Sequence, residues 1–141
     1  ADRLIDTFSF SNQGNSFMAA HKLLLVDDEV VGLEIMKDLL ESSGYQIETA
    51  QSGTEALEKF SPEIDLIVLD VMLPGMDGYE VAEQVRSHAP HGDVPIIFLT
   101  ALKSEEDKGK AIKAGASDFV TKPVDIEDME KRIAHLLEKV D

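Results

Sequence analysis

The chain has 141 residues and a mass of 15.5 kDa, which is the size of one ordinary domain. Its formal net charge of −15 argues against direct binding of nucleic acid, which needs a basic face, and its lack of cysteine excludes disulfides, zinc–thiolate sites and cysteine nucleophiles. No apolar run approaches the roughly 20 residues of a membrane span, so we expect a cytoplasmic protein without membrane contact.

Residues 1–17 differ in composition from the rest of the chain. They hold three of the six phenylalanines and a polar stretch, and charged residues interrupt any run that would suggest a secretory signal. We expect residues 1–17 to be a tail, either derived from expression or the end of an upstream segment, and residues 18–141 to form the domain. A docking tail that uses Leu4, Ile5 and Phe8 at helical spacing is the alternative interpretation.

Five segments have the pattern of β-strands. Residues 23–26, 66–69 and 96–99 are short, uninterrupted aliphatic runs, which is typical of parallel strands covered on both faces. Residues 45–50 alternate between apolar and polar, and residues 118–121 are short and mixed. These last two segments are therefore predicted to be the edges of the sheet.

A helical pattern follows each predicted strand. The first helix is expected to bury Val31, Ile35, Leu39 and Leu40 on one face and to end before Gly44. The other four helices are expected after a capping box at residues 52–55, from about Gly78, over residues 104–114, and after a cap at Asp125.

The alternation of strands and helices predicts an α/β fold, a doubly wound five-stranded parallel sheet with five helices. With the second and fifth strands at the edges, the simplest strand order is 2-1-3-4-5. The helix at residues 104–114 stands apart, because Gly109 lies within it and Ile112 is its single large apolar residue. Glycine there costs about 1 kcal/mol against alanine, so we expect this helix to be the most loosely held.

Polar groups follow four of the five predicted strands. Asp27 and Asp28 follow the first strand, Asp70 the third, Thr100 the fourth and Lys122 the fifth. Each has an ordinary explanation as a helix cap, a strand residue or a surface charge. Because the carboxyl ends of parallel strands meet at one edge of the sheet, their coincidence favours a single site.

The groups at these strand ends suit a phosphoryl group bound with Mg²⁺. Three clustered carboxylates without histidine or cysteine are the oxygen donors that Mg²⁺ prefers. Asp70, on the central strand, is the best-placed carboxylate nucleophile and would form an acyl phosphate. The metal and Lys122 would neutralise the phosphoryl oxygens, and Thr100 would donate a hydrogen bond to one of them.

The sequence resembles the receiver domain of two-component response regulators, which has a flavodoxin-like fold. Four motifs in order carry the resemblance, which runs from Lys22 to about Val140: LLLVDDE at 23–29, DLIVLDVMLPGMDG at 65–78, PIIFLTA at 95–101 and GASDFVTKP at 115–123. The resemblance implies that Asp70 is the phosphoacceptor. It also implies that Asp27, Asp28 and the backbone carbonyl of Met72 join Asp70 around Mg²⁺.

The resemblance further implies a two-state switch. Thr100 would turn toward the phosphoryl group, Phe119 would swing into the space vacated, and Lys122, followed by a cis proline, would bind the phosphate. The surface of the fourth helix, fifth strand and fifth helix would then repack. The implied partners are a sensor histidine kinase or phosphotransfer protein and a downstream protein or fused output domain, with phosphorylation-dependent dimerisation a further expectation. The domain would catalyse only its own phosphorylation and dephosphorylation.

Several alternatives remain beside this interpretation. An aspartyl phosphohydrolase usually carries a second Asp where Met72 stands, and an FMN-binding protein would meet repulsion from Asp27 and Asp28. A phosphate-independent interaction module is the main alternative, although such modules usually lose some of the acidic residues or the lysine. In the family that the sequence resembles, the positions of Met72 and Leu102 influence how fast the phosphoryl group is lost. Both residues are apolar here and cannot position an attacking water, so the resemblance implies slow self-dephosphorylation. Two local alternatives remain. His88 and His91 could form a metal-binding pair, and residues 77–78 could be a simple turn or helix cap.

Overall fold

The computed structural model describes residues 20–87, 91–101 and 104–140. The expected tail at residues 1–17 lies outside the described residues, and the domain boundary at residue 18 stays a prediction. Among the helices that are described, none is long and apolar enough to cross a membrane.

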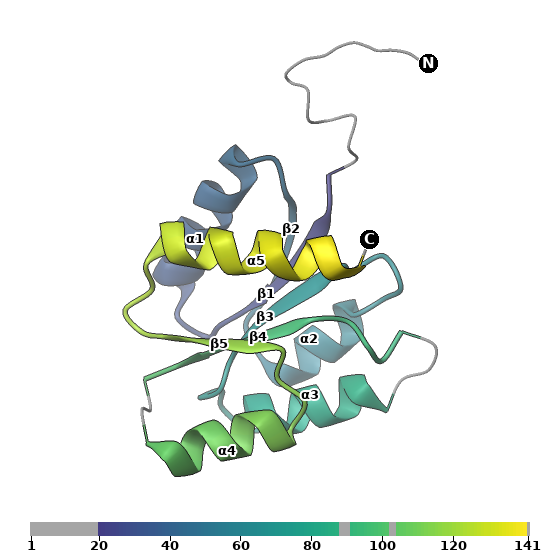
Figure 1. The fold of residues 1–141 in the computed structure, drawn as a ribbon, viewed down its shortest axis with the longest axis vertical. Helices are drawn as coiled ribbons and strands as arrows, with labels where there is room; N and C mark the ends of the chain where they lie inside the picture. Colours follow the sequence, from purple (N-terminus) through teal and green to yellow (C-terminus); the bar gives the residue numbers. More distant parts are fainter. Residues whose placement is uncertain (1–19, 88–90, 102–103, 141) are drawn as a thin grey trace.

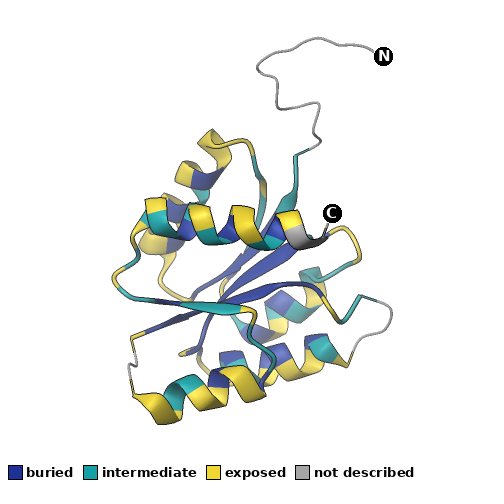
Figure 2. Cartoon of the chain, in the orientation of Figure 1, coloured by how far each residue is buried: buried dark blue, intermediate teal, exposed yellow. Residues whose placement is uncertain are grey.

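Five parallel strands form one sheet in the order β2-β1-β3-β4-β5, as the sequence predicts (Figure 1). Their bounds are β1 Lys22–Val26, β2 Gln46–Ala50, β3 Leu66–Asp70, β4 Ile96–Thr100 and β5 Asp118–Thr121. The two predicted edge strands are at the edges. Every residue of β3 and β4 is buried, because helices cover both faces of the central strands (Figure 2).

Five helices cover the sheet in two layers. Their bounds are α1 Val30–Ser42, α2 Gly53–Lys59, α3 Gly78–Arg86, α4 Glu105–Lys113 and α5 Ile126–Val140. Helices α1 and α5 lie on one face, and α2, α3 and α4 lie on the other (Figure 1). Each layer has its own core, since alternate residues of every central strand point into one of two separate clusters of buried aliphatic side chains.

Local capping signals position several of these helices. Gly44 has the left-handed φ of 104° expected of a residue that ends a helix. Ser52 accepts a hydrogen bond from the Glu55 amide at 3.1 Å, but the Glu55 carboxylate accepts from the amide of Gln51 and not from that of Ser52. Only half of the predicted capping box is therefore formed. Asp125 caps α5 as predicted and accepts from the amide N–H three residues on.

The buried face of α1 differs from the sequence prediction. Of the four residues expected to be buried only Leu40 is; the exposed fractions of the others are 74% for Val31, 54% for Ile35 and 42% for Leu39. Leu33 and Met36 join Leu40 against the sheet instead. The helix carries two apolar stripes that both repeat at helical spacing, so the prediction chose the wrong one. One apolar stripe of α1 consequently faces outward.

Helix α4 has few apolar contacts with the sheet. Ser104 caps it and accepts a hydrogen bond from the Asp107 amide at 3.1 Å. Within the helix Ala111 is buried, while Ile112, the single large apolar residue, is 67% exposed. Little apolar area is therefore removed from water, which agrees with the expectation of a loosely held helix.

Candidate functional site

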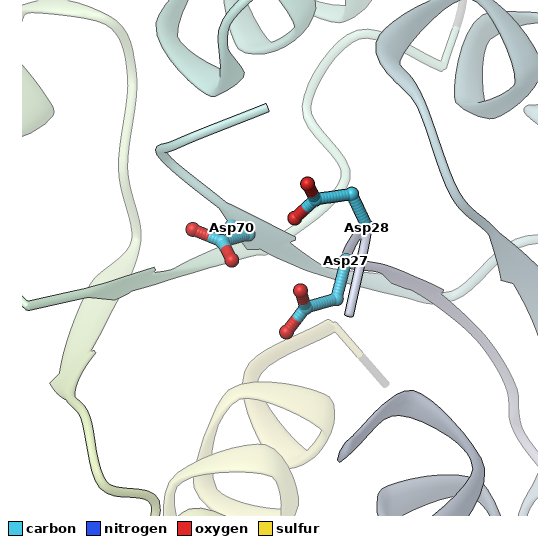
Figure 3. A group of neighbouring side chains, drawn as sticks. All are labelled: Asp27, Asp28 and Asp70. Carbon is cyan, nitrogen blue, oxygen red and sulfur yellow. The ribbon is translucent and has the colours of Figure 1, made fainter. Parts of the chain in front are cut away.

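Three carboxylates meet at the carboxyl edge of the sheet. Asp27 and Asp28 directly follow β1, and Asp70 is the last residue of the neighbouring strand β3 (Figure 3). One oxygen from each carboxylate lies within 4.8 Å of the other two. Asp27 and Asp70 are buried, and Asp28 is exposed. A cluster of three oxygen donors with one open side fits a hard divalent cation such as Mg²⁺.

Lys122 reaches into this cluster from the loop after β5. Its ammonium nitrogen lies 2.5 Å from Oδ2 of Asp70 and 3.4 Å from Oδ2 of Asp27. Its peptide bond to Pro123 is cis, as the resemblance implied. Glu29 is a further neighbour, with Oε1 at 3.7 Å from the same nitrogen. Glu29 is not among the predicted site residues, although it directly follows the two aspartates.

Burial and charge act on Asp70 and Lys122 in opposite ways. Burial raises the pKa of Asp70, and repulsion from Asp27 adds to this, while Lys122 and the Met72 amide act against it. Burial lowers the pKa of Lys122, but its contacts with Asp70 and Asp27 outweigh this and the net pKa is raised. Lys122 therefore carries a full positive charge at neutral pH, beside a carboxylate whose ionised form burial disfavours.

Backbone contacts fix the position of Asp70. Its Oδ1 accepts a hydrogen bond from the Met72 amide at 2.9 Å, and the Gly78 amide donates to the Val71 carbonyl at 2.9 Å. A Cβ on Gly78 would lie 2.3 Å from the carbonyl oxygen of Asp70, so only glycine fits there. Asp77 caps α3, in line with the turn or cap predicted at residues 77–78, but the sequence does not indicate the close approach of Gly78 to the Asp70 carbonyl.

Thr100 and Phe119 lie near each other behind the carboxylates. Thr100 ends β4 and is 7% exposed, and Phe119 lies on the neighbouring strand β5. Both line a small, partly enclosed cavity of about 10 Å³, together with Val71 and Tyr79. The ammonium of Lys108 on α4 lies 5.8 Å from the centroid of the Phe119 ring. The cavity holds at most about one water molecule, so it has no room for an aromatic ring as it stands.

A larger cavity opens beside the carboxylates, toward α1. Its volume is about 510 Å³, and Asp27 and Lys122 form part of its wall. Apolar side chains from α1 and from the start of α5 line the rest, including Ile35 and Ile126. The exposed apolar stripe of α1 therefore continues into the candidate site.

His91 has contacts that differ from the proposed metal pair. Its Nε2 lies 2.6 Å from the carbonyl oxygen of Ile64, and its ring stacks on Phe60 with centroids 5.7 Å apart. These contacts tie the loop before β4 to the segment between α2 and β3. His88 of the alternative metal pair and Leu102, at a position expected to influence loss of the phosphoryl group, lie outside the described residues.

Comparison with known proteins gives the family. The sequence model of the response regulator receiver domain matches residues 23–134, so the chain belongs to this family. The chain is 43% identical over 121 residues to the "Probable transcriptional regulator ycf27" of Cyanidium caldarium. This match covers 85% of this chain and 47% of that protein. It is 37% identical over 118 residues to the response regulator SaeR of Staphylococcus aureus, and this match covers 84% of this chain and 51% of that protein.

Solved structures agree with this assignment. The chemotaxis protein CheY4 of Vibrio cholerae superposes with a TM-score of 0.79 at 33% identity, over 84% of this chain and 99% of that one. The chain spans about half the length of the curated relatives it matches. As a receiver domain it is a phosphorylation-dependent signalling switch, and receiver domains generally bind Mg²⁺ at an acidic pocket like the one formed here.

Proposed function

We propose that the chain accepts a phosphoryl group on Asp70 and that this modification sets the state of its α4–β5–α5 face. One observation carries the proposal: a buried carboxylate at the end of the central strand contacts a lysine ammonium at 2.5 Å and has two further carboxylates beside it. This arrangement combines a nucleophile, a fixed positive charge and a set of oxygen donors for a metal ion.

Asp27, Asp28 and Asp70 would hold Mg²⁺, with the Met72 carbonyl as a fourth donor from the protein. When bound, Mg²⁺ supplies positive charge that offsets the carboxylates and the transferring phosphoryl oxygens. The donor chemistry supports this choice, because the three side chains offer only oxygen atoms and one of them is open to solvent. Burial, with a smaller contribution from Asp27, raises the pKa of Asp70, and a bound cation would favour its ionised form.

The transfer step follows from the contacts of Asp70. One carboxylate oxygen attacks the phosphorus atom of the donor, and the bond from phosphorus to the donor's leaving atom breaks, with the electron pair leaving on that atom. Lys122 stays close enough to bind an oxygen of the new acyl phosphate. Hydrolysis by water later returns the carboxylate and releases inorganic phosphate. In this proposal the domain is a phosphoacceptor and not an enzyme that turns over a separate substrate.

Thr100 and Phe119 would couple the phosphoryl group to the output face. Movement of the Thr100 hydroxyl toward the phosphoryl oxygens would enlarge the small cavity that both residues line. Because this cavity is too small for an aromatic ring, Phe119 can enter it only after Thr100 has moved. The change would then alter the surface formed by α4, β5 and α5, which contacts a downstream protein, a fused output domain or a second copy of the chain.

The exposed stripe of α1 is the surface that we propose for the phosphodonor protein. Val31, Ile35 and Leu39 are exposed, and Ile35 lines the cavity that also has Asp27 and Lys122 in its wall. A protein that delivers a phosphoryl group to Asp70 must approach this open side of the site, so it would bury the stripe during transfer. A sensor histidine kinase or a phosphotransfer protein fits this role.

The test is the intact mass of the protein after incubation with acetyl phosphate, with and without Mg²⁺. We expect a Mg²⁺-dependent gain of one phosphoryl group that hydroxylamine removes, and no gain in Asp70→Asn. Asp65→Asn is the matched control, because Asp65 precedes β3 at the opposite end of the strand and should leave the gain unchanged. A folded protein that gains no phosphoryl group under any condition would contradict the proposal and favour a phosphate-independent interaction module.

A further inference from the structure

Arg86, the last residue of α3, joins three separate parts of the chain. Its guanidinium group is half-buried and donates to the carbonyl oxygen of Gly115 from Nε at 3.1 Å and from Nη2 at 2.5 Å. Its Nη1 donates to the carbonyls of Gly92 at 2.8 Å and Val94 at 2.5 Å. The planar fork of an arginine can serve several acceptors at once, which a lysine ammonium on a flexible stem does with far less precision.

The turn between α4 and β5 is shaped to receive this guanidinium. Gly115 has a left-handed φ of 99°, and a Cβ at this position would lie 2.7 Å from Nε of Arg86. Glycine therefore meets two requirements at position 115: it adopts the left-handed backbone conformation, and it lets the Arg86 side chain approach the backbone closely. Burial lowers the pKa of Arg86, and Asp93 acts in the opposite direction. The Arg86 guanidinium is partly removed from water, and its hydrogen bonds to three carbonyl groups compensate for the lost hydration.

The same turn is also fastened to the sheet. The Ser117 amide donates to the Ile96 carbonyl at 2.8 Å, and the Ile96 amide donates back to the Ser117 hydroxyl at 3.0 Å. The amides of Ala114 and Ala116 donate to carbonyls within α4, both at 3.0 Å. The carboxyl end of α4 is thus tied to α3 through Arg86 and to β4 through Ser117.

The amino end of α4 is held differently. Ser104 forms hydrogen bonds with its own helix: its hydroxyl bonds to the carboxylate and the amide of Asp107, and its carbonyl accepts from the Lys108 amide. Beyond this first turn, Ile112 is exposed and Ala111 is the buried residue of the helix. Among the described residues, hydrogen bonds tie the turn after α4 to α3 and β4, whereas the amino half of α4 contacts the domain through Lys108, whose ammonium lies 5.8 Å from the centroid of the Phe119 ring. The carboxyl end of α4 is therefore the end that is held by hydrogen bonds to other elements.

We propose that Arg86 holds the carboxyl end of α4 as a fixed pivot, so that the phosphorylation-driven change in this helix is a swing of its amino end about Gly115. The pivot rests on the proposed function, since the swing is a response to phosphorylation of Asp70. It also gives Arg86 a role distant from the phosphorylation chemistry: it keeps the turn before β5 in place while the rest of α4 moves. A hinge of this kind needs one end fixed by more contacts than the other.

Hydrogen exchange measured by mass spectrometry tests the pivot. Wild type, Arg86→Lys and Arg132→Lys are compared with and without acetyl phosphate and Mg²⁺, reading residues 104–110 and 114–117 separately. Arg132→Lys is the matched control, since Arg132 is an α5 arginine that pairs with Asp118 and Asp128. Gly115→Ala is a second, independent disturbance of the same contact, because its Cβ would displace the guanidinium. Exchange in β3 reports global unfolding, and intact mass reports phosphorylation.

In wild type, we expect phosphorylation to change exchange at residues 104–110 and to leave residues 114–117 protected. In Arg86→Lys and Gly115→Ala, exchange at residues 114–117 should rise at least tenfold relative to β3, a change of about 1.4 kcal/mol, while phosphorylation of Asp70 is retained. Arg132→Lys should behave as wild type. The pivot is wrong if phosphorylation changes both segments of wild type equally, or if Arg86→Lys leaves residues 114–117 as protected as before.

The failure of the proposed function would be visible separately. If wild type gains no phosphoryl group, the phosphoacceptor assignment fails, and the swing driven by Asp70 fails with it. Arg86 is then tested as an anchor in the resting protein alone, where residues 114–117 must exchange more slowly than residues 104–110. That difference must be lost in Arg86→Lys and kept in Arg132→Lys, and any other result rejects the anchor as well.

Discussion

Replacing Asp28 by asparagine should stabilise the domain in the absence of divalent cations. Asp28 is exposed, and one of its oxygens lies within 4.8 Å of oxygens of Asp27 and Asp70. At this distance and in an environment close to water, each like-charge pair costs about 0.9 kcal/mol, and salt lowers this value further. Removing both pairs should therefore raise the free energy of unfolding by about 1 kcal/mol, or the melting temperature by about 4 °C.

Thermal unfolding in EDTA and in Mg²⁺ is the assay. Wild type should melt at a higher temperature in Mg²⁺, because a ligand that binds the folded state stabilises it, and Asp28→Asn should lose most of this Mg²⁺-dependent rise. Glu58→Gln, which removes one exposed negative charge from α2, corrects for the general benefit of lowering the net charge. If Asp28→Asn gains no more stability in EDTA than Glu58→Gln, the carboxylates are not repelling one another and the reasoning is refuted.

Three further predictions concern the packing of α1, the titration of Asp70 and the rate at which the phosphoryl group is lost. Leu33→Ala should lower the free energy of unfolding by about 2–4 kcal/mol and Ile35→Ala by less than about 1 kcal/mol in urea titrations, because Leu33 is buried and Ile35 exposed; equal losses would contradict the orientation of α1. Because burial raises the pKa of Asp70, the stability that this group contributes to the metal-free protein should increase, as pH is lowered, at a higher pH than for an ordinary aspartate; in urea titrations in EDTA, a difference between wild type and Asp70→Asn that changes only at the ordinary aspartate pKa would argue against this. Met72→Asn and Leu102→Glu should each speed loss of the phosphoryl group in a decay assay followed by intact mass, and unchanged decay would show that slow loss has another cause.

Sequence patterns predicted the sheet and the site because both depend on short-range rules. An aliphatic run marks a buried parallel strand, and the residue after it lies at the carboxyl edge of the sheet. The sequence alone therefore predicts that Asp70 and Lys122 lie at the same edge. The orientation of α1 was not predictable in this way. Ile35 and Met36 belong to neighbouring apolar stripes, and helical periodicity gives both the same spacing.

Contacts made by backbone atoms could not be predicted from the sequence either. The Arg86 side chain binds three carbonyl groups, and any residue type supplies a carbonyl, so no pattern of side chains indicated its partners. Glu29 illustrates a different limit, because Glu29 follows β1 and Lys122 follows β5, and these two strands are not neighbours in the sheet. Such features emerge only when distant segments have been placed in three dimensions.

The close approach of Gly78 to the Asp70 carbonyl has a consequence for redesign of this domain. The Val71 carbonyl and the Gly78 amide close residues 71–78 into a loop whose two ends are joined by a hydrogen bond of 2.9 Å. The ends of this loop are constrained by backbone packing and Leu73 is buried in the core, whereas Pro74 and Gly75 are exposed. Loops from other receivers can therefore be grafted between the fixed ends to vary the rim of the site, provided that the glycine at the distal end is kept.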